Sequence, residues 1–401
     1  MPWTETCAMK ERFDFIAEHS IGEAPMSALC LRYGISRKTG YKWLSRHIAD
    51  PGGSLEDRSR APKTCPHRTP PESRDLILSL KSTYPFWGPK KLKAFLERNY
   101  PDFRCPAAST IGEILAGAGL TRSRRRRRET PPHEAPLSHA TAPNRVWCID
   151  FKGWFCTGDG VRVDPLTITD AASRYLVRLV ALEAPRREAV WPILDSAFRE
   201  FGLPDRLRSD NGTPFASCAA GGLSRLSVAL IKAGVIPERI DPGRPDQNGR
   251  HERMHRVLKE ETASPPACSW RAQAARFAEF RRVYNHLRPH EALGQKPPAS
   301  LYTPSARAWH GRFRSPEYEA GVMIRKVGSR GDVKFQGRKV FVCEALYGEP
   351  VALEEVACGR WSVRYGPVPL GWIEKGKLTR PARREARRRQ RNAEKTTNDA
   401  N

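Results

Sequence analysis

The stretch that decides how this chain is interpreted is Asp241-Pro-Gly-Arg-Pro-Asp-Gln-Asn-Gly-Arg-His-Glu-Arg-Met-His255, with Glu252 near its end. A loop rich in proline and glycine leads through Asn248-Gly249 into a polar segment that is predicted to be helical as far as Glu261. Taken alone, the segment fits two chemistries. His251-Glu252-x-x-His255 has the spacing of a zinc peptidase helix. A single carboxylate just inside a helix also suits a metal-dependent nuclease.

The composition points to a polyanionic partner. The chain has 401 residues, enough for two to four domains, and 69 Lys and Arg against 44 Asp and Glu give a net charge of +25. Such an excess favours nucleic acid over a membrane surface. We expect no membrane partner, because no run of about 18 apolar residues exists, and the N-terminus lacks the pattern of a secretory signal. The ten cysteines never form Cys-x-x-Cys, which disfavours a zinc ribbon and predicts thiols in a cytoplasmic, nucleoid-associated protein.

Residues 1–50 are predicted to form a helix-turn-helix DNA-binding domain, with helices over residues 9–20, 26–33 and 37–47. The last helix would enter the major groove and present Arg37, Lys38 and Lys42 to DNA. Gly40 departs from this pattern, because glycine inside a helix costs about 1 kcal/mol relative to alanine. The expected small core consists of Leu29, Ile35, Trp43 and Leu44.

Two linkers flank a second helical module. Residues 51–71 are rich in Gly, Pro, Ser and Arg, and residues 72–121 are predicted to be helical, with Lys90 and Lys91 as candidate DNA contacts. Residues 122–143 begin with six arginines in seven positions, among them Arg124 and Arg125. A like-charge block stays extended unless phosphates neutralise it, so this linker either lies on DNA or is simply solvated.

Residues 144–305 are predicted to form an α/β core that carries three ordered acids. Three strands come first, and Asp150 lies inside the first of them. Helix and strand then alternate; a short strand ends at Asp210, and Glu252 lies in a later helix. Between Asp150 and Asp210 there are 59 residues, and between Asp210 and Glu252 there are 41. This order of elements and acids is that of a ribonuclease-H-like fold.

Four motifs in this region resemble those of the retroviral-integrase superfamily, and in particular bacterial insertion-sequence transposases. They are Trp147-Cys-Ile-Asp-Phe-Lys, Ser209-Asp-Asn-Gly-Thr-Pro-Phe, Pro245-Asp-Gln-Asn-Gly-Arg-His-Glu-Arg and Tyr284-Asn-His-Leu-Arg-Pro-His-Glu-Ala-Leu-Gly. The turn Trp87-Gly-Pro similarly resembles the second helix-turn-helix of those transposases. The resemblance covers roughly residues 10–305.

The resemblance implies an acidic triad of Asp150, Asp210 and Glu252, both catalytic and metal-binding. Two Mg²⁺ ions, with Mn²⁺ able to substitute, are expected to activate the attacking oxygen and stabilise the leaving oxygen of a phosphodiester. Arg244 and Lys259 are candidate phosphate contacts, and Asp170 is expected to be structural.

The zinc peptidase alternative is disfavoured, because the residues around His251 and His255 are mostly cationic rather than apolar and the net charge has no role in that chemistry. We expect the two histidines instead to line the helix face or to help position DNA.

Residues 320–376 are predicted to form short strands of a small β-barrel, which resembles the SH3-like C-terminal domain of integrases, and residues 377–401 a basic disordered tail. The whole is expected to be multidomain: all-α helix-turn-helix modules, a ribonuclease-H-like core and the barrel.

The expected function is that of a DNA transposase that cleaves and joins double-stranded DNA, both mobile-element ends and target, as a homo-oligomer on DNA. The alternatives are a DNA-binding regulator with an inactive or repurposed core, and a metal-dependent nuclease without joining activity.

Overall fold

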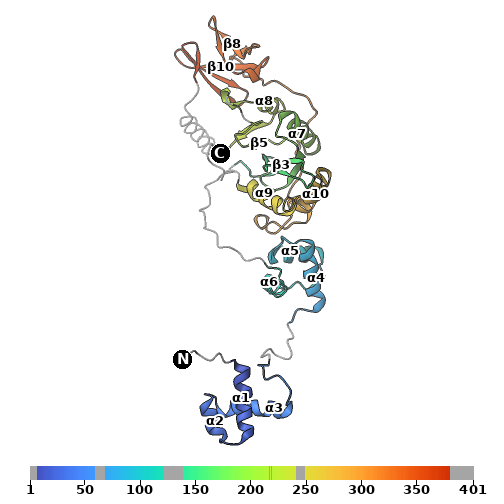
Figure 1. Cartoon of the computed structure of the whole chain (residues 1–401). Helices are drawn as coiled ribbons and strands as arrows, with labels where there is room; N and C mark the ends of the chain where they lie inside the picture. The colour runs from blue at the N-terminus through green and yellow to red at the C-terminus, as the bar shows by residue number, and fades with distance from the viewer. Residues whose placement is uncertain are drawn as a thin grey trace. The chain divides into compact units, whose positions relative to one another are not determined.

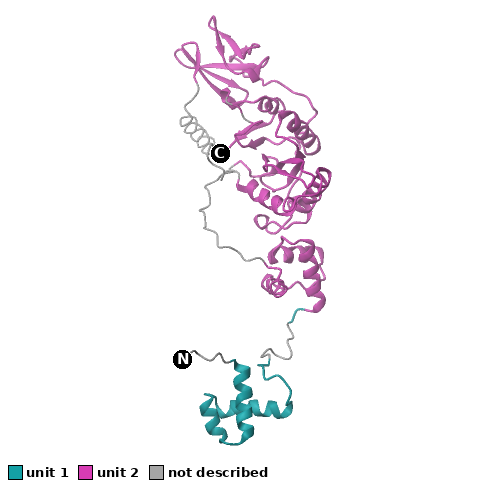
Figure 2. Ribbon diagram, in the orientation of Figure 1, with its two compact units in different colours: residues 1–69 teal, residues 70–401 magenta. Residues whose placement is uncertain are grey.

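The computed structural model describes residues 7–58, 68–121, 139–215, 217, 219–240 and 249–379 (Figure 1). The chain divides into two compact units, residues 1–69 and residues 70–401, which Figure 2 shows in different colours. Among the described residues, no helix combines the length and apolar character needed to cross a membrane.

The described residues of the first unit form three helices: α1 (Ala8–Ile21), α2 (Met26–Arg32) and α3 (Arg37–Ala49). Ser36 caps α3, because its hydroxyl accepts a hydrogen bond from the main-chain N–H of Thr39 at 3.2 Å. The predicted succession of three helices is therefore confirmed. The predicted core is confirmed for Leu29 and Trp43, which are buried together with Phe15 and Leu55, whereas Leu44 lies outside that cluster.

The packing around Gly40 explains why a glycine occupies this position in a helix, and the sequence alone does not show this. It is buried in α3, where a Cβ atom would lie 2.7 Å from Cys30 Sγ and 3.0 Å from Phe15 Cζ. A side chain at this position would press on the side chains of Cys30 from α2 and Phe15 from α1, which would have to shift. The helix-propensity cost of the glycine is thus offset by the close approach of α1 and α2 to α3.

The second helical module consists of α4 (Pro71–Thr83), α5 (Pro89–Asn99) and α6 (Ala108–Gly117). Its core is built on Trp87, which stacks on Tyr84 with ring centroids 4.0 Å apart. Lys81 Nζ donates hydrogen bonds to the carbonyl oxygens of Pro85 at 2.6 Å and Trp87 at 3.0 Å, which fixes the turn before α5. The predicted apolar set on α5 is buried: Leu92, Phe95 and Leu96.

The central sheet runs in the order β4-β3-β1-β5-β6, and β2 pairs with the start of β3. Its strands are β1 (Val146–Phe151), β2 (Phe155–Cys156), β3 (Arg162–Asp170), β4 (Leu176–Leu182), β5 (Arg206–Ser209) and β6 (Ile236–Arg239). The first three long strands are antiparallel neighbours, whereas β1, β5 and β6 are parallel. The predicted order of strands and helices is confirmed.

Helices cover both faces of this sheet (Figure 1). Apolar side chains of α7 (Arg187–Phe201) and α8 (Arg225–Lys232) join the cluster that contains Trp147 and Ile168. Those of α9 (Gly249–Thr262) and α10 (Trp270–Arg282) join a separate cluster with Leu176. The sheet is therefore sandwiched, and α9 brings Glu252 to the face opposite α7 and α8.

The Tyr284–Gly294 motif closes the core. Residues Val283–Leu287 continue α10 as a π-helical turn, and the amide of Asn285 forms two hydrogen bonds with the main chain of Leu176: it accepts from N at 2.8 Å and donates to O at 3.0 Å. Arg288 is buried and pairs with Glu261 of α9. The motif thus ties the end of α10 to the sheet and to α9. Short 3-10 helices lie at η1 (Ala220–Gly222), η4 (Glu291–Leu293), η5 (Pro298–Ser300) and η6 (Glu344–Leu346).

The C-terminal region is rich in sheet, but the predicted barrel is not formed among the described residues. A five-stranded sheet has the order β13-β12-β11-β10-β7, and β8 pairs only with β9 in a separate hairpin. The strands are β7 (Met323–Lys326), β8 (Asp332–Phe335), β9 (Arg338–Phe341), β10 (Pro350–Ala357), β11 (Arg360–Tyr365), β12 (Val368–Glu374) and β13 (Lys377–Thr379). The hairpin joins the sheet through shared apolar side chains such as Phe335 rather than through a backbone ladder, so the sheet stays open.

Candidate active site

Two of the predicted acids lie at the same edge of the central sheet. Asp150 is near the end of β1, and Asp210 directly follows β5. These strands are parallel neighbours, with Cys148 opposite Arg208. Because parallel strands end on the same side of a sheet, the two carboxylates emerge together, at the edge where α/β folds commonly bind ligands.

The turn after β5 holds Asp210 in place. The main-chain N–H of Gly212 donates to Asp210 Oδ1 at 3.1 Å, and the Asn211 amide donates to the carbonyl oxygen of Ile240 at 2.8 Å. A Cβ atom on Gly212 would lie 2.9 Å from Asp210 Oδ2. The Asp-Asn-Gly sequence therefore combines a side-chain cap, an anchor to the neighbouring chain and room for the carboxylate.

Glu252 lies in the first turn of α9 and is exposed, whereas Met254 and Leu258 of the same helix are buried against the sheet. Burial raises the pKa of Asp150 to about 7, and the negative charges of Asp210 and Glu252 add to this shift. Three acids from three elements thus act on one another electrostatically. We call Asp150, Asp210 and Glu252 the carboxylate site.

The two histidines of α9 lie on its buried face, 2% and 6% exposed. Thr167 of β3 contacts both rings, with its Oγ1 2.6 Å from His251 Nε2 and 2.7 Å from His255 Nε2. The histidines therefore line a face of the helix, as the first of the two expectations states, and a part in positioning DNA stays a prediction. The zinc peptidase arrangement is not formed, because Glu252 is exposed while both Nε2 atoms are engaged by Thr167.

Asp170 is on the opposite face of the sheet from Asp150. In the β1–β3 register Asp150 faces Thr167 and Trp147 faces Asp170, and positions three apart on a strand point to opposite faces. The Asp170 carboxylate is buried and accepts hydrogen bonds from Asn144 N at 2.8 Å, Ser173 N at 2.7 Å and Ser173 Oγ at 2.6 Å. These bonds account for Asp170 as a structural acid.

The donor set suits a divalent cation. The carboxylate site offers oxygen ligands, which Mg²⁺ prefers. Asp150, His251 and His255 also have ligand atoms within 4.8 Å of one another, so a nitrogen donor lies close to the acids. Asp150, beside two other acids, carries a charge that a bound cation would stabilise.

The cationic candidates of the first unit are on the surface of α3. Arg37, Lys38 and Lys42 are all exposed. Lys42 Nζ lies 4.6 Å from the centroid of the Trp43 ring, which Arg12 and Arg46 also contact. This helix presents the charges that contact with a polyanion requires.

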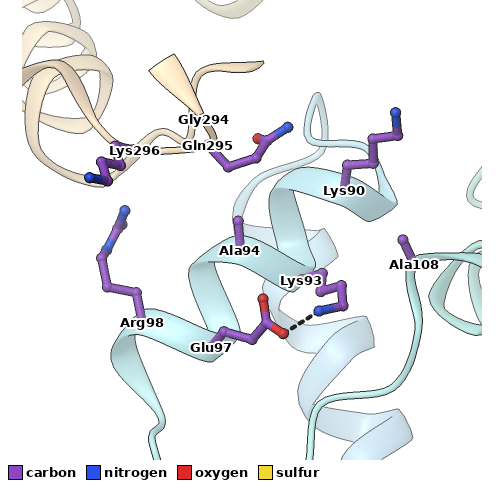
Figure 3. Close-up of a pocket in the computed structure, with 9 residues that line it drawn as sticks. All are labelled: Lys90, Lys93, Ala94, Glu97, Arg98, Ala108, Gly294, Gln295 and Lys296. Carbon is purple, nitrogen blue, oxygen red and sulfur yellow. Dashed lines mark hydrogen bonds and ion pairs between the residues drawn. The ribbon is translucent and has the colours of Figure 1, made fainter. Parts of the chain in front are cut away.

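A second cationic surface is a hollow of about 560 Å³ between α5 and the loop that follows η4, which we call the basic pocket (Figure 3). Its charged lining residues are Lys90, Lys93, Glu97, Arg98 and Lys296. Lys93 is paired with Glu97, as the dashed line in Figure 3 shows. Arg98 donates to the carbonyl oxygen of Leu287 at 2.9 Å, and Lys90 lies 3.8 Å from Glu291.

Of the other cationic residues predicted to contact DNA, the structure describes Lys259 and Lys91. Lys259 is exposed on α9, seven positions after Glu252 and thus on the same side of the helix. Lys91 is half-buried, and burial together with the charge of Arg288 lowers its pKa to about 8. Arg124, Arg125 and Arg244 lie outside the described residues.

Three residues with contacts at these sites were not predicted from the sequence. Thr167 and Thr169 contact the α9 histidines, and Lys296 lines the basic pocket. The two threonines of β3 are two positions apart, on the face that Asp150 shares, and this was an available signal for the first two. Nothing in the sequence indicated that the loop with Lys296 lies against α5.

Comparison with known proteins places these features in a family. Residues 140–245 match a family model described as an integrase core domain, and residues 233–298 match another of the same description. Residues 39–115 match a homeodomain-like domain.

Two insertion-element proteins are similar over the central part of the chain. The IS407 uncharacterized 31.7 kDa protein of Burkholderia multivorans is 32% identical over 217 residues, which is 54% of this chain and 75% of that protein. The IS476 uncharacterized 39.2 kDa protein of Xanthomonas euvesicatoria is 28% identical over 228 residues, 56% of this chain. The chain spans 63% of the length of the latter relative.

Among solved structures, the HTLV-2 integrase catalytic core domain in complex with magnesium is 13% identical, with a TM-score of 0.33. The match covers 40% of this chain and 98% of that one.

Proposed function

Since this chain belongs to the insertion-sequence transposases of the integrase superfamily, we propose that it binds the ends of a mobile element and cleaves and joins their strands at the carboxylate site. The observation that carries the proposal is that Asp150 and Asp210 emerge at the same edge of the parallel β1–β5 pair, with Glu252 in the first turn of α9. Like charges are costly to hold together in a partly buried site. Their convergence from β1, the β5 turn and α9 is explained by a cationic ligand.

We propose that Asp150, Asp210 and Glu252 hold two divalent ions, Mg²⁺ or Mn²⁺. When bound, such ions activate an attacking oxygen and stabilise a departing one in phosphodiester transfer. The chain's own part is to place and orient the acids. The parallel β1–β5 pairing aligns Asp150 with Asp210, the Gly212 N–H fixes one Asp210 oxygen, and burial of Met254 and Leu258 fixes the rotation of α9.

We propose that successive segments of the chain have different roles. Residues 1–50 and 72–121 would bind the element ends, residues 51–71 and 122–143 would link the modules, and residues 144–305 would carry the chemistry. Arg37, Lys38, Lys42, Lys90 and Lys259 are exposed on these parts, and we propose that they contact DNA phosphates or bases. Residues 320–376 keep their proposed likeness to the SH3-like domain of integrases, supported by one shared apolar core, without a closed barrel. A homo-oligomer on DNA and a cytoplasmic, nucleoid-associated location complete the proposal.

The test uses the full chain with a labelled DNA duplex that carries one element end. We expect Asp150→Asn and Asp210→Asn to reduce cleavage and joining in Mg²⁺ by about a thousandfold or more, and to leave end binding within about threefold. Asp75→Asn, at an exposed position of α4, is the matched control and should cleave normally.

Three other outcomes would change the assignment. End binding without cleavage by the wild-type chain in either metal would favour the regulator. Cleavage without joining of the released 3′ end to a target duplex would favour the nuclease. Unchanged cleavage by Asp210→Asn would remove the carboxylate site from the mechanism.

A further inference from the structure

The protonation of the two α9 histidines follows from one hydroxyl group. Thr167 Oγ1 lies 3.0 Å from the carbonyl oxygen of Asp150, 2.6 Å from His251 Nε2 and 2.7 Å from His255 Nε2. A hydroxyl has one proton to donate and two lone pairs that accept. The carbonyl oxygen can only accept, so it takes the proton. Both imidazoles must therefore donate their Nε2–H to Thr167.

Both rings are enclosed between α9 and the sheet, 2% and 6% exposed, and the form of histidine that binds a metal ion is the neutral imidazole. A neutral imidazole has one N–H, so each Nδ1 carries a lone pair. His251 Nδ1 accepts a hydrogen bond from Thr169 Oγ1 at 3.0 Å. His255 Nδ1 instead lies 4.0 Å from Asp150 Oδ2.

Two electron-rich atoms thus face one another at the carboxylate site. Two metal bonds of about 2.1 Å hold their ligand atoms about 3 Å apart when they meet at right angles and about 4.2 Å apart when they are opposite one another, so one ion can reach both atoms across the 4.0 Å between them. A metal-bound histidine usually gives its other N–H to an oxygen that orients the ring, and Thr167 has that role here.

We propose that His255 Nδ1 is a ligand, beside Asp150, of a divalent cation at the carboxylate site, and that this nitrogen favours Mn²⁺ over Mg²⁺. The inference rests on the proposed metal site and adds a ligand to it. Imidazole nitrogen suits transition-metal ions, whereas Mg²⁺ prefers an all-oxygen set. His251 is excluded from this role because Thr167 and Thr169 occupy both of its ring nitrogens.

The deciding measurement needs no activity and no DNA. Mn²⁺ is added to the metal-free full chain, and pulsed electron paramagnetic resonance records whether the bound ion is coupled to a ¹⁴N nucleus. We expect an imidazole-nitrogen coupling in the wild-type chain, loss of that coupling in His255→Gln, and its retention in His251→Gln. Glutamine can keep a donor near Thr167 while it removes the Nδ1 ligand, and a thermal melt checks that each variant is folded.

Titration of the same proteins gives the ion preference. The ratio of Mn²⁺ to Mg²⁺ affinity should fall about tenfold or more in His255→Gln and stay within about twofold in His251→Gln. Bound Mn²⁺ without nitrogen coupling in the wild type would overturn the inference.

The variant Asp210→Asn distinguishes failure of the proposed histidine ligand from failure of the proposed metal site. If it abolishes Mn²⁺ binding while the wild type shows no nitrogen coupling, the carboxylate site stands and the histidine ligand is wrong. If it leaves Mn²⁺ binding unchanged, the proposed metal site itself is wrong.

Discussion

The side-chain hydroxyl of Thr167 donates a hydrogen bond to the carbonyl oxygen of Asp150 at 3.0 Å. The same Oγ1 atom accepts a hydrogen bond from the Nε2 atom of each α9 histidine. One residue of β3 therefore connects the main chain at the first acid to the helix that carries the third. The position of Glu252 relative to Asp150 depends on this buried contact. There are 101 residues between the two acids in the chain.

Thr167→Val should destabilise the second unit. Valine keeps the shape but removes the hydroxyl, so the Nε2–H groups of His251 and His255 lose their acceptor in a buried site. An unsatisfied buried polar group costs about 1–3 kcal/mol, and we expect a loss of about 2–3 kcal/mol in the free energy of unfolding. Thr167→Ser keeps the hydroxyl and should lose less than about 1 kcal/mol. The free energy of unfolding of both variants is measured by urea denaturation. Equal losses in the two variants would show that the missing hydroxyl is not the cause of the destabilisation.

Asp150→Asn should stabilise the metal-free chain, and more so at higher pH. Burial and the neighbouring acids raise the pKa of Asp150 to about 7 from an ordinary value near 4. Below about pH 4 the carboxyl is protonated in both the folded and the unfolded states, so it has no effect. As the pH rises from 4 to 7 only the unfolded state ionises freely, and the folded state loses stability. In EDTA the variant should therefore melt at a higher temperature than the wild type at pH 8, and the two melting temperatures should converge near pH 4.

Adding Mg²⁺ supplies the control for that experiment. A bound cation removes the penalty in the wild type but not in the variant, so the order of melting temperatures at pH 8 should reverse. If the wild type gains no stability from Mg²⁺, Asp150 is not a metal ligand.

Gly40→Ala should loosen the first unit although alanine is the better helix former. The propensity gain is about 1 kcal/mol, whereas overpacking against Cys30 Sγ costs about 1–3 kcal/mol. Hydrogen exchange of α3 amides, followed by mass spectrometry in the full chain, should be faster in the variant. Adding Cys30→Ala removes the nearest contact and should restore slow exchange. Slower exchange in Gly40→Ala alone would contradict the packing explanation.

Lys296→Gln should weaken DNA binding without changing its sequence preference. A lysine on a phosphate releases a counterion, so its loss should reduce the slope of log affinity against log salt by about 1. Lys93→Gln is the matched control in the same pocket, because the charge of Lys93 is already offset by Glu97. Equal effects of the two variants would exclude a specific phosphate contact at Lys296.

The sequence predicts the acids better than their surroundings. The positions of Asp150, Asp210 and Glu252 on their strands and helix could be predicted because strand alternation, a turn signal and helix periodicity are local. Their role as a triad is what the family resemblance implies, and it stays a prediction. The contact of Thr167 with His251 depends on the register of β3 against β1 and on the rotation of α9, which no local pattern determines. The same holds for Gly40, whose neighbours are on other helices.

The barrel prediction was not confirmed for a related reason. Strand propensity located the C-terminal strands, but closure depends on which edges pair. Here β8 and β9 pair only with each other and contribute Val333 and Val340 to the apolar core.

The most direct test of the carboxylate site is strand transfer of a pre-cleaved, labelled element end into a target duplex by the full chain in Mg²⁺. Glu252→Gln is compared with Glu260→Gln, the same chemical change at another exposed position of α9. We expect Glu252→Gln to lose joined product by about a thousandfold or more, with end binding intact, and Glu260→Gln to join as the wild type does. Equal joining by the two variants would contradict a role of Glu252 in strand transfer.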